Sequence, residues 1–248
     1  MTSRPRTFLC AGIALALPLA ALLQGCDSAG SSSTQHAAHQ AVAAEVPSAQ
    51  PTSTPQPAAL TRAQLRRALL APSDVTSKTR RTPVSEDRGS YSSSDKACRQ
   101  LVDSLNATSP KGSVRSAKES LSGGEQGPFV DQQLHALSSS KRAARRVADL
   151  RSGVEKCDRV TVSYDNAEPS ELAVALEPLD LDADRSVAIG FRAANGELDG
   201  FGFVRVVVQS EQLVVELAFA ATSAAEVERL AEDAVAKVER RLARSATG

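Results

Sequence analysis

The chain reads FGFVRVVVQSEQLVVELAFA over residues 201–220. An apolar run over 201–208 is followed by a polar turn at 209–212. A second segment then places a large apolar residue at every second position, at Leu213, Val215, Leu217 and Phe219. This pattern is typical of two antiparallel strands joined by a short turn. The stretch therefore predicts a β-hairpin.

Three shorter segments upstream of the hairpin show the same two-residue period, at 160–164, 172–176 and 187–191. Asn195-Gly196, a turn-forming pair, separates the last of them from the run at 201–208. Together these segments predict a meander of antiparallel strands. Two weaker strand-like segments lie at 112–120 and 129–137, with glycine- and proline-containing turn signals between them.

Helices are predicted on both sides of these strands. Thr61 and Gln64 form a capping box, so a helix is expected from Arg62 to about Leu70, where Pro72 stops it. Apolar stripes predict further helices at 96–105, 139–157 and from 223 onward. The polar stretch 73–95 is expected to be either a mobile loop or a flap over a pocket. The predicted fold class is α+β, with helices packed on an antiparallel sheet in one domain over residues 59–248.

The N-terminal residues 1–25 resemble a bacterial lipoprotein signal peptide. Arg4 and Arg6 precede an apolar run over 8–23, and LLQGC closes the segment at 22–26, although Gln24 departs from the usual Ala or Ser. The resemblance implies cleavage before Cys26 and its acylation, with palmitate among the chains, which would anchor the protein outside the cytoplasm on the bacterial cell membrane. The alternative is an ordinary secretory signal that happens to contain a cysteine.

Residues 26–58 follow as a segment rich in Ser, Thr, Gln, Pro and Ala, with few apolar residues to bury. This composition predicts a disordered tether between the membrane and the folded domain. His36 and His39 lie within it at a spacing that could suit a metal. No other ligand is near them, so a solvated tether is the favoured interpretation.

Four cysteines are present. Cys10 would leave with the signal peptide and Cys26 would carry lipid. Cys98 and Cys157 would then remain in an oxidising compartment, where they are expected to form a disulfide that stabilises the fold by about 4 kcal/mol. The alternative is two separately buried thiols.

The charge of the chain argues against nucleic acid as a partner. The 29 basic and 29 acidic side chains balance, and removal of Arg4 and Arg6 with the signal peptide leaves 27 against 29, a formal charge of −2. A protein of this charge lacks the electrostatic basis for binding nucleic acid.

Sequence motifs for catalysis are weak, so no enzyme, cofactor or metal site is predicted. The folded part has one histidine, His135, which lies in a strand-like alternation and has no G-x-S-x-G partner motif. Asp180, Asp182 and Asp184 lack the glycine and terminal glutamate of a calcium loop, so a solvated turn is expected there. The glycine-rich stretch 122–127 lacks the Lys-Ser/Thr pair of a phosphate loop.

Three segments of the chain resemble the PknH-like extracellular sensor domain of bacterial receptor kinases and free-standing lipoproteins. They are LLAPSDV at 69–75, DKACRQL at 95–101 and SSSKRAARRVADLRSGVEKC at 138–157. The resemblance covers residues 60–242 and implies a cleft without known catalysis that senses an unidentified extracellular ligand. Members of the family have two disulfides, whereas this chain can form only one. Without a kinase part, a signal would have to pass through another protein.

Two candidate sites accompany three functional hypotheses. Four phenylalanines could line a ligand cavity, although a packed core is the favoured interpretation: Phe191, Phe201, Phe203 and Phe219. An arginine and aromatic cluster in the 73–95 stretch could bind a partner, or be a solvated loop: Arg80, Arg81, Arg88 and Tyr91. We expect a sensor-like or ligand-binding domain. The alternatives are a carrier of lipid or another apolar molecule, and a protein-interaction module of the cell envelope.

Overall fold

A computed structural model describes residues 60–84, 89–165, 167–182, 184–196 and 198–246. Cys10, Cys26, His36 and His39 lie outside these residues, as do the predicted signal peptide and tether. The elements are, in chain order, α1 (Arg62–Ala68), α2 (Pro72–Val75), β1 (Arg80–Thr82), β2 (Ser90–Ser92), η1 (Lys96–Cys98), α3 (Arg99–Asn106), β3 (Ser113–Ser122), β4 (Phe129–Leu137), α4 (Ser140–Glu155), β5 (Arg159–Ser163), β6 (Ser170–Leu176), β7 (Ser186–Ala193), β8 (Gly202–Ser210), β9 (Leu213–Ala220) and α5 (Ala224–Ala246).

The strands form one antiparallel sheet in the order β1-β3-β4-β9-β8-β7-β6-β5-β2. The predicted meander is confirmed, because β5 to β9 are neighbours in sequence order. The predicted hairpin is β8 and β9, with Ser210 paired to Leu213 across a two-residue turn. The β3–β4 hairpin then extends the sheet by pairing β4 with β9. The α+β class is confirmed.

The stretch 73–95 is more ordered than a long loop, since it contributes the end of helix α2 and both edge strands. Pro72 does follow the end of α1, and it also opens α2. β1 pairs with β3 at one edge of the sheet, and β2 pairs with β5 at the other. A flat sheet of nine strands would separate its edges by roughly 38 Å. Residues 83–89, which join β1 to β2, can reach at most roughly 28 Å, so the sheet must curl.

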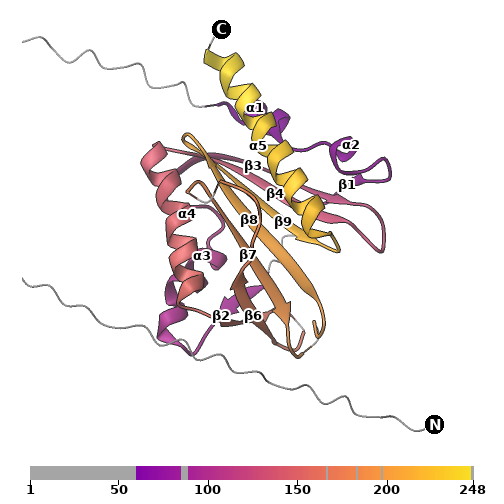
Figure 1. The fold of residues 1–248 in the computed structure, drawn as a ribbon, viewed down its shortest axis with the longest axis vertical. Coiled ribbons are helices and arrows are strands. Elements are labelled where there is room, and N and C mark those ends of the chain that lie inside the picture. Colours follow the sequence, from indigo (N-terminus) through magenta and orange to yellow (C-terminus); the bar gives the residue numbers. More distant parts are fainter. Residues whose placement is uncertain (1–59, 85–88, 166, 183, 197, 247–248) are drawn as a thin grey trace, which may run out of the picture. The chain divides into compact units, whose positions relative to one another are not determined.

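Helices cover the two faces of the sheet unequally (Figure 1). We call the side that packs against α1 and α5 the α5 face, and the side that packs against α3 and α4 the α4 face. Each face has its own apolar cluster: one joins α1 and α5 to β3, β4, β8 and β9, and the other joins α3 and α4 to β5, β6, β7 and the intervening residues Val207 of β8 and Val214 of β9. Alternate residues of one strand therefore belong to different clusters.

The predicted disulfide between Cys98 and Cys157 is confirmed, with the two Cα atoms 4.7 Å apart. It joins the beginning of α3 to the end of α4, across 59 residues of sequence. The same two helices approach closely at Gly153, where an added Cβ would lie 3.2 Å from the Cβ of Leu101. The disulfide and this contact fix α3 and α4 as one unit on the α4 face.

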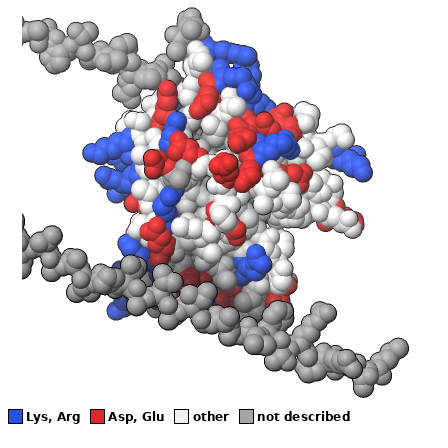
Figure 2. Space-filling view, viewed as in Figure 1, with Lys and Arg blue, Asp and Glu red and all other residues white. Residues whose placement is uncertain are grey.

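Charged side chains of both signs are distributed over the surface. In Figure 2, basic side chains gather along the outer side of α4 and at the C-terminal end of α5, and acidic ones lie between these helices.

None of the helices among the described residues combines the length and apolar character that a membrane-spanning segment needs.

Candidate functional site

A pocket of about 300 Å³ opens on the part of the α4 face that α3 and α4 leave uncovered. Its lining comes from β3, β4, β8 and β9, with contributions from β2, the end of α3 and the loops beside them. Val84, just after β1, and Tyr91, on β2, both line it although they belong to opposite ends of the strand order. The curl of the sheet thus places the pocket on its inner side.

Two alanines of β9 form the floor of the pocket. Ala218 pairs with Asp131 on β4 and with Arg205 on β8. Ala220 pairs in the same way with Phe129 and Phe203. Side chains directly opposite each other in a sheet share a face, so each alanine leaves a gap between two larger neighbours. The pocket exists because β9 carries small residues at these two positions.

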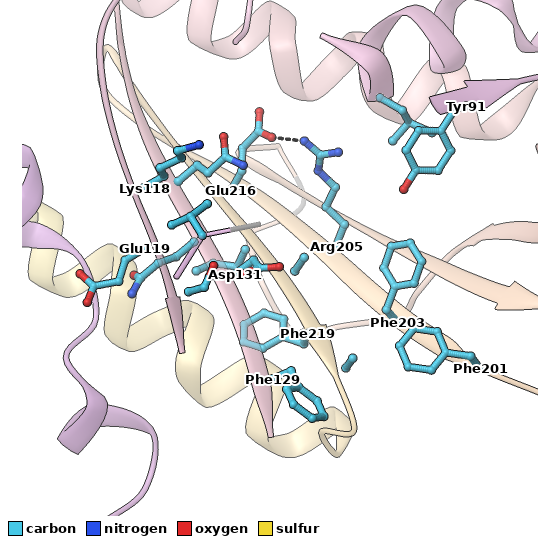
Figure 3. Close-up of a pocket in the computed structure, with 18 of the residues that line it drawn as sticks. Tyr91, Lys118, Glu119, Phe129, Asp131, Phe201, Phe203, Arg205, Glu216 and Phe219 are labelled. Atoms are coloured by element: carbon cyan, nitrogen blue, oxygen red, sulfur yellow. Dashed lines mark hydrogen bonds and ion pairs between the residues drawn. The ribbon is translucent and has the colours of Figure 1, made fainter. Parts of the chain in front are cut away.

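Aromatic side chains form one end of the pocket (Figure 3). The Phe203 ring stacks on that of Phe191, with centroids 4.5 Å apart, and Phe201 lies 6.4 Å from Phe203. Tyr91 approaches Phe191 from β2 at 6.4 Å. Tyr164 also lines this end. These rings offer an apolar surface for part of a ligand.

A buried charge cluster forms the other end. Glu216 of β9 is 4 % exposed, and its Oε1 accepts a hydrogen bond from Nε of Arg146 on α4 at 3.1 Å. Its Oε2 accepts one from the guanidinium of Arg205 on β8 (Figure 3). Arg146 is 9 % exposed and Arg205 is 18 % exposed. Both carboxylate oxygens are therefore paired with a guanidinium, as a buried carboxylate requires.

Neighbouring charges decide the ionisation of Glu216. Burial alone would raise its pKa, but Arg205, Arg146 and His135 outweigh burial and lower the pKa to about 2. Burial lowers the pKa of Arg146, and Glu216 raises that of Arg205 against the effect of burial. All three groups are charged at neutral pH, because an arginine pKa lies far above it.

Further polar side chains line the pocket near this cluster. Burial raises the pKa of the Tyr91 hydroxyl, which points into the pocket and stays protonated at neutral pH. Asp131 and Lys118 are exposed, and neither has a hydrogen-bond or ion-pair partner among the described residues. Glu119 also borders the pocket but is ion-paired with Arg81 of β1. The pocket thus has an aromatic end and a polar end.

The four candidate phenylalanines divide between the pocket and the two cores. Phe201 is 44 % exposed and Phe203 is half-buried, and both line the pocket with their rings (Figure 3). Phe191 is buried in the cluster beneath α3 and α4, behind Phe203. Phe219 borders the pocket, but its side chain packs in the cluster beneath α5. Only two of the four rings are therefore available to a ligand.

The proposed arginine and aromatic cluster is divided between the two edge strands. Arg80 and Arg81 lie exposed on β1, whereas Tyr91 is half-buried on β2 at the opposite edge of the sheet. Arg88 lies outside the described residues. Tyr91 belongs to the pocket instead, where its neighbour is Arg205.

The other residues considered from the sequence lie apart from the pocket. His135 is buried on β4 beneath α4, and residues 122–127 belong to the β3–β4 turn region. In the connection between β6 and β7, Asp182 accepts a hydrogen bond from the amide of Asp184, and the Asp180 amide donates to Glu228. The described part of the chain has no group of three or more side chains suited to a metal ion.

Arg146, Arg205 and Glu216 were not identified from the sequence, although it contains a signal for them. Arg205 and Glu216 are the only charged residues inside two apolar strands of a predicted hairpin. Across a two-residue turn, the register places them diagonally on one face. Arg146 lies on the apolar stripe of its helix. Charges within apolar patterns that share a face indicate a buried ion-pair cluster.

Comparison with known proteins gives a consistent family and fold. The family model described as the PknH-like extracellular domain matches residues 50–237. The crystal structure of the extracellular domain of PknH from Mycobacterium tuberculosis matches with a TM-score of 0.57 and 18 % identity, covering 75 % of this chain and 100 % of that one. An uncharacterized protein from Mycobacterium smegmatis, the Rv0999 ortholog, matches at 12 % identity and a TM-score of 0.40, covering 67 % of this chain and 92 % of that one. No curated protein sequence matches the chain.

Proposed function

Because the chain belongs to the family of PknH-like extracellular domains, an extracytoplasmic type of domain, we propose that it is a non-catalytic sensor module that binds a small amphipathic molecule. The observation that carries this proposal is the pocket over Ala218 and Ala220, with aromatic rings at one end and charged groups at the other. Concave sites that combine an apolar lining with a few polar groups are typical of small-molecule binding.

The chemistry of the lining favours binding over catalysis. Its described residues include Ser120 but neither cysteine nor histidine, the commonest general base, so the lining holds no imidazole that could activate this serine. Glu216, the most buried carboxylate of the lining, is held ionised by two guanidiniums and has no free oxygen to accept a proton from a substrate. These groups can orient a ligand through charge and hydrogen bonds.

The volume of the pocket favours a small ligand over a two-chain lipid. Ligand pockets generally span about 300 to 1,000 Å³, and this one is about 300 Å³. A pocket of this size suits a molecule with one short chain or one ring, so a sensor of a small molecule is favoured over a lipid carrier.

The proposal includes attachment to the membrane through Cys26. As a flexible coil, residues 27–58 would reach roughly 30 Å, which lets the domain stand clear of the membrane surface. An envelope protein would then read the bound state of the domain. Incorporation of labelled palmitate by the native chain but not by Cys26→Ser supports the anchor, and equal labelling of both contradicts it.

Ligand binding can be tested through the two tyrosines of the chain. The protein has two tyrosines and no tryptophan, and Tyr91 and Tyr164 both line the pocket. Tyrosine fluorescence therefore reports on this site without background. We expect a saturable change when the purified protein is titrated with 1-octanol, octanoate or octylammonium, which do not absorb at these wavelengths.

The matched control fills the pocket. Ala218→Leu places a larger side chain over the floor between Asp131 and Arg205, so it should abolish the fluorescence response to all three probes while circular dichroism stays unchanged. If none of the probes gives a saturable response in the native protein, or if Ala218→Leu responds like the native protein, the pocket is not the binding site.

A further inference from the structure

In the buried cluster at the polar end of the pocket, guanidiniums outnumber carboxylates by one. Two guanidiniums, of Arg146 and Arg205, are ion-paired with a single carboxylate, that of Glu216. The exposed Asp149 also acts on Arg146 through its charge but forms no ion pair with it among the described residues. Each guanidinium uses one oxygen of this carboxylate. Buried charges are normally paired, so an uncompensated cation beside an open pocket indicates a place for an anion.

The surplus charge is available at Arg205 and not at Arg146. Arg146 lies on the buried side of α4, does not line the pocket, and also donates to the backbone oxygen of Ser104 at 3.4 Å. Arg205 does line the pocket, and among the described residues its guanidinium has no hydrogen-bond acceptor other than Glu216. A guanidinium has five N–H donors in a planar fork. The donors that Glu216 leaves unused are open to a ligand.

The ring of Tyr91 belongs to the aromatic end, but its hydroxyl is close enough to interact with Arg205 and adds a second donor beside it. It points into the pocket in Figure 3, on the side where Arg205 lies. The main-chain N–H and C=O of Tyr91 are held by the side chain of Asn106, which fixes β2 at this place. The hydroxyl itself has no hydrogen-bond partner among the described residues. Arg205 and Tyr91 together present donors from two sides of the pocket.

We propose that the ligands of this pocket are small amphipathic anions, whose carboxylate or similar group binds Arg205 and Tyr91 and whose apolar part lies over Ala220 against Phe203 and Phe129. The inference rests on the proposed function, since it names the class of ligand for that site. The strand register agrees with this orientation of the ligand. Arg205 lies beside Ala218, and the two phenylalanines lie on either side of Ala220, the next residue of β9 on the same face.

Asp131 is the nearest opposing feature, since it lines the pocket across Ala218 from Arg205. Two strand spacings separate their backbones by roughly 10 Å. Asp131 is exposed to water, whose high dielectric constant weakens its repulsion of an anion held at Arg205. Direct contact with Arg205 therefore outweighs the repulsion from Asp131.

The test compares three probes that share one eight-carbon chain and differ only in the charge of the head group. Tyrosine fluorescence titrations of the purified protein at pH 7 give dissociation constants for octanoate, 1-octanol and octylammonium. We expect octanoate to bind at least about 10-fold more tightly than the other two probes, because only its carboxylate can form a charge-assisted hydrogen bond with Arg205. Equal affinities, or tighter binding of octylammonium, would overturn the anion proposal while leaving the pocket as a binding site.

Two substitutions move the affinity in opposite directions. Arg205→Gln should weaken octanoate binding at least about 10-fold, and the matched control Arg192→Gln, an exposed residue of β7 outside the pocket, should leave it unchanged. Glu216→Gln frees Arg205 from its internal carboxylate and should tighten octanoate binding several-fold, which a damaged fold would not do. Circular dichroism checks that each variant is folded.

The outcomes separate the two proposals. If no probe binds, the proposed function itself fails. If all three bind but Arg205→Gln and Arg192→Gln behave alike, only the anion class fails. The native-protein probe series decides the question even if Arg205→Gln and Glu216→Gln do not fold.

Discussion

Along β9, four side chains point to the α5 face and four to the α4 face. The first set, beneath α5, is Leu213, Val215, Leu217 and Phe219, and the second is Val214, Glu216, Ala218 and Ala220. The α5 face is apolar at every one of these positions. The α4 face changes along the strand from an apolar residue to a charge and then to two alanines.

The difference follows from what covers each face. Helix α5 contacts both β8 and β9 and buries the large side chains that face it. Helices α3 and α4 cover only part of the other face (Figure 1). The pocket opens on the part that they leave uncovered. A large side chain at Ala218 would have no helix to pack against there. The α5 face therefore stabilises the fold by burying large apolar side chains. The α4 face buries fewer of them at the end of β9 and presents a binding surface there.

Substitutions at adjacent residues of β9 should show this difference most strongly. Leu217→Ala removes a side chain that is 1 % exposed beneath α5 and should lower the free energy of unfolding by about 3 kcal/mol. Ala218→Leu, on the other face, adds volume to an open pocket and should change it by less than about 0.5 kcal/mol. Urea unfolding followed by circular dichroism measures both. Similar losses for the two variants would mean that the faces do not differ in packing.

The charge cluster of the α4 face should make stability depend on pH in the acid range. The pKa of Glu216 is lowered from 4.5 to about 2 in the folded state, so the group stabilises the fold above pH 4.5 and loses this contribution as the pH falls toward 2. A shift of this size corresponds to about 3 kcal/mol. Urea unfolding at pH 7, 4.5, 3 and 2.5 should show the loss in the native protein.

Glu216→Gln is the control for this pH dependence, since other carboxyl groups titrate over the same range. The variant should be less stable than the native protein at pH 7, and the difference should shrink as the pH falls from 4.5 to 2.5. Parallel stability curves for the two proteins would show that Glu216 has an ordinary pKa in the folded state.

The strands and helices with strong local patterns could be predicted from the sequence. The apolar run at 201–208 and the two-residue period at 213–219 predicted β8 and β9, and the Thr61–Gln64 capping box is present as expected, with the Thr61 amide donating to Gln64 Oε1 at 2.7 Å. The disulfide between Cys98 and Cys157 could also be predicted, because few cysteines remained to pair. In each case the information lies in neighbouring residues or in a simple count.

The edge strands and the pocket could not be predicted in this way. β1 and β2 are three-residue polar segments without an apolar period, and they are strands only because they pair with β3 and β5. The pocket forms because none of the described helices packs over Ala218 and Ala220. The sequence does not reveal this, because alanines also occur on packed faces, as the buried Ala136 does. The sequence leaves open whether the stretch around Tyr91 is a mobile loop or a flap over a pocket, because the position of Tyr91 at the pocket depends on the curl of the whole sheet.

A buried glutamine offers the smallest and most local test of the two faces. Gln132 of β4 points to the α5 face, where its Oε1 accepts from the amide of Leu70 at 2.7 Å and its Nε2 donates to the Leu70 carbonyl at 2.9 Å. Gln132→Leu would leave both backbone groups buried without a partner, which should cost about 2 kcal/mol. The next residue, Gln133, points to the α4 face and is half-buried at the pocket. Gln133→Leu should cost less than about 0.5 kcal/mol in the same urea unfolding experiment. Equal losses of stability for the two variants would mean that the segment between α1 and α2 does not depend on Gln132. The expected difference would show that the α5 face is tightly packed even where it contains a polar side chain.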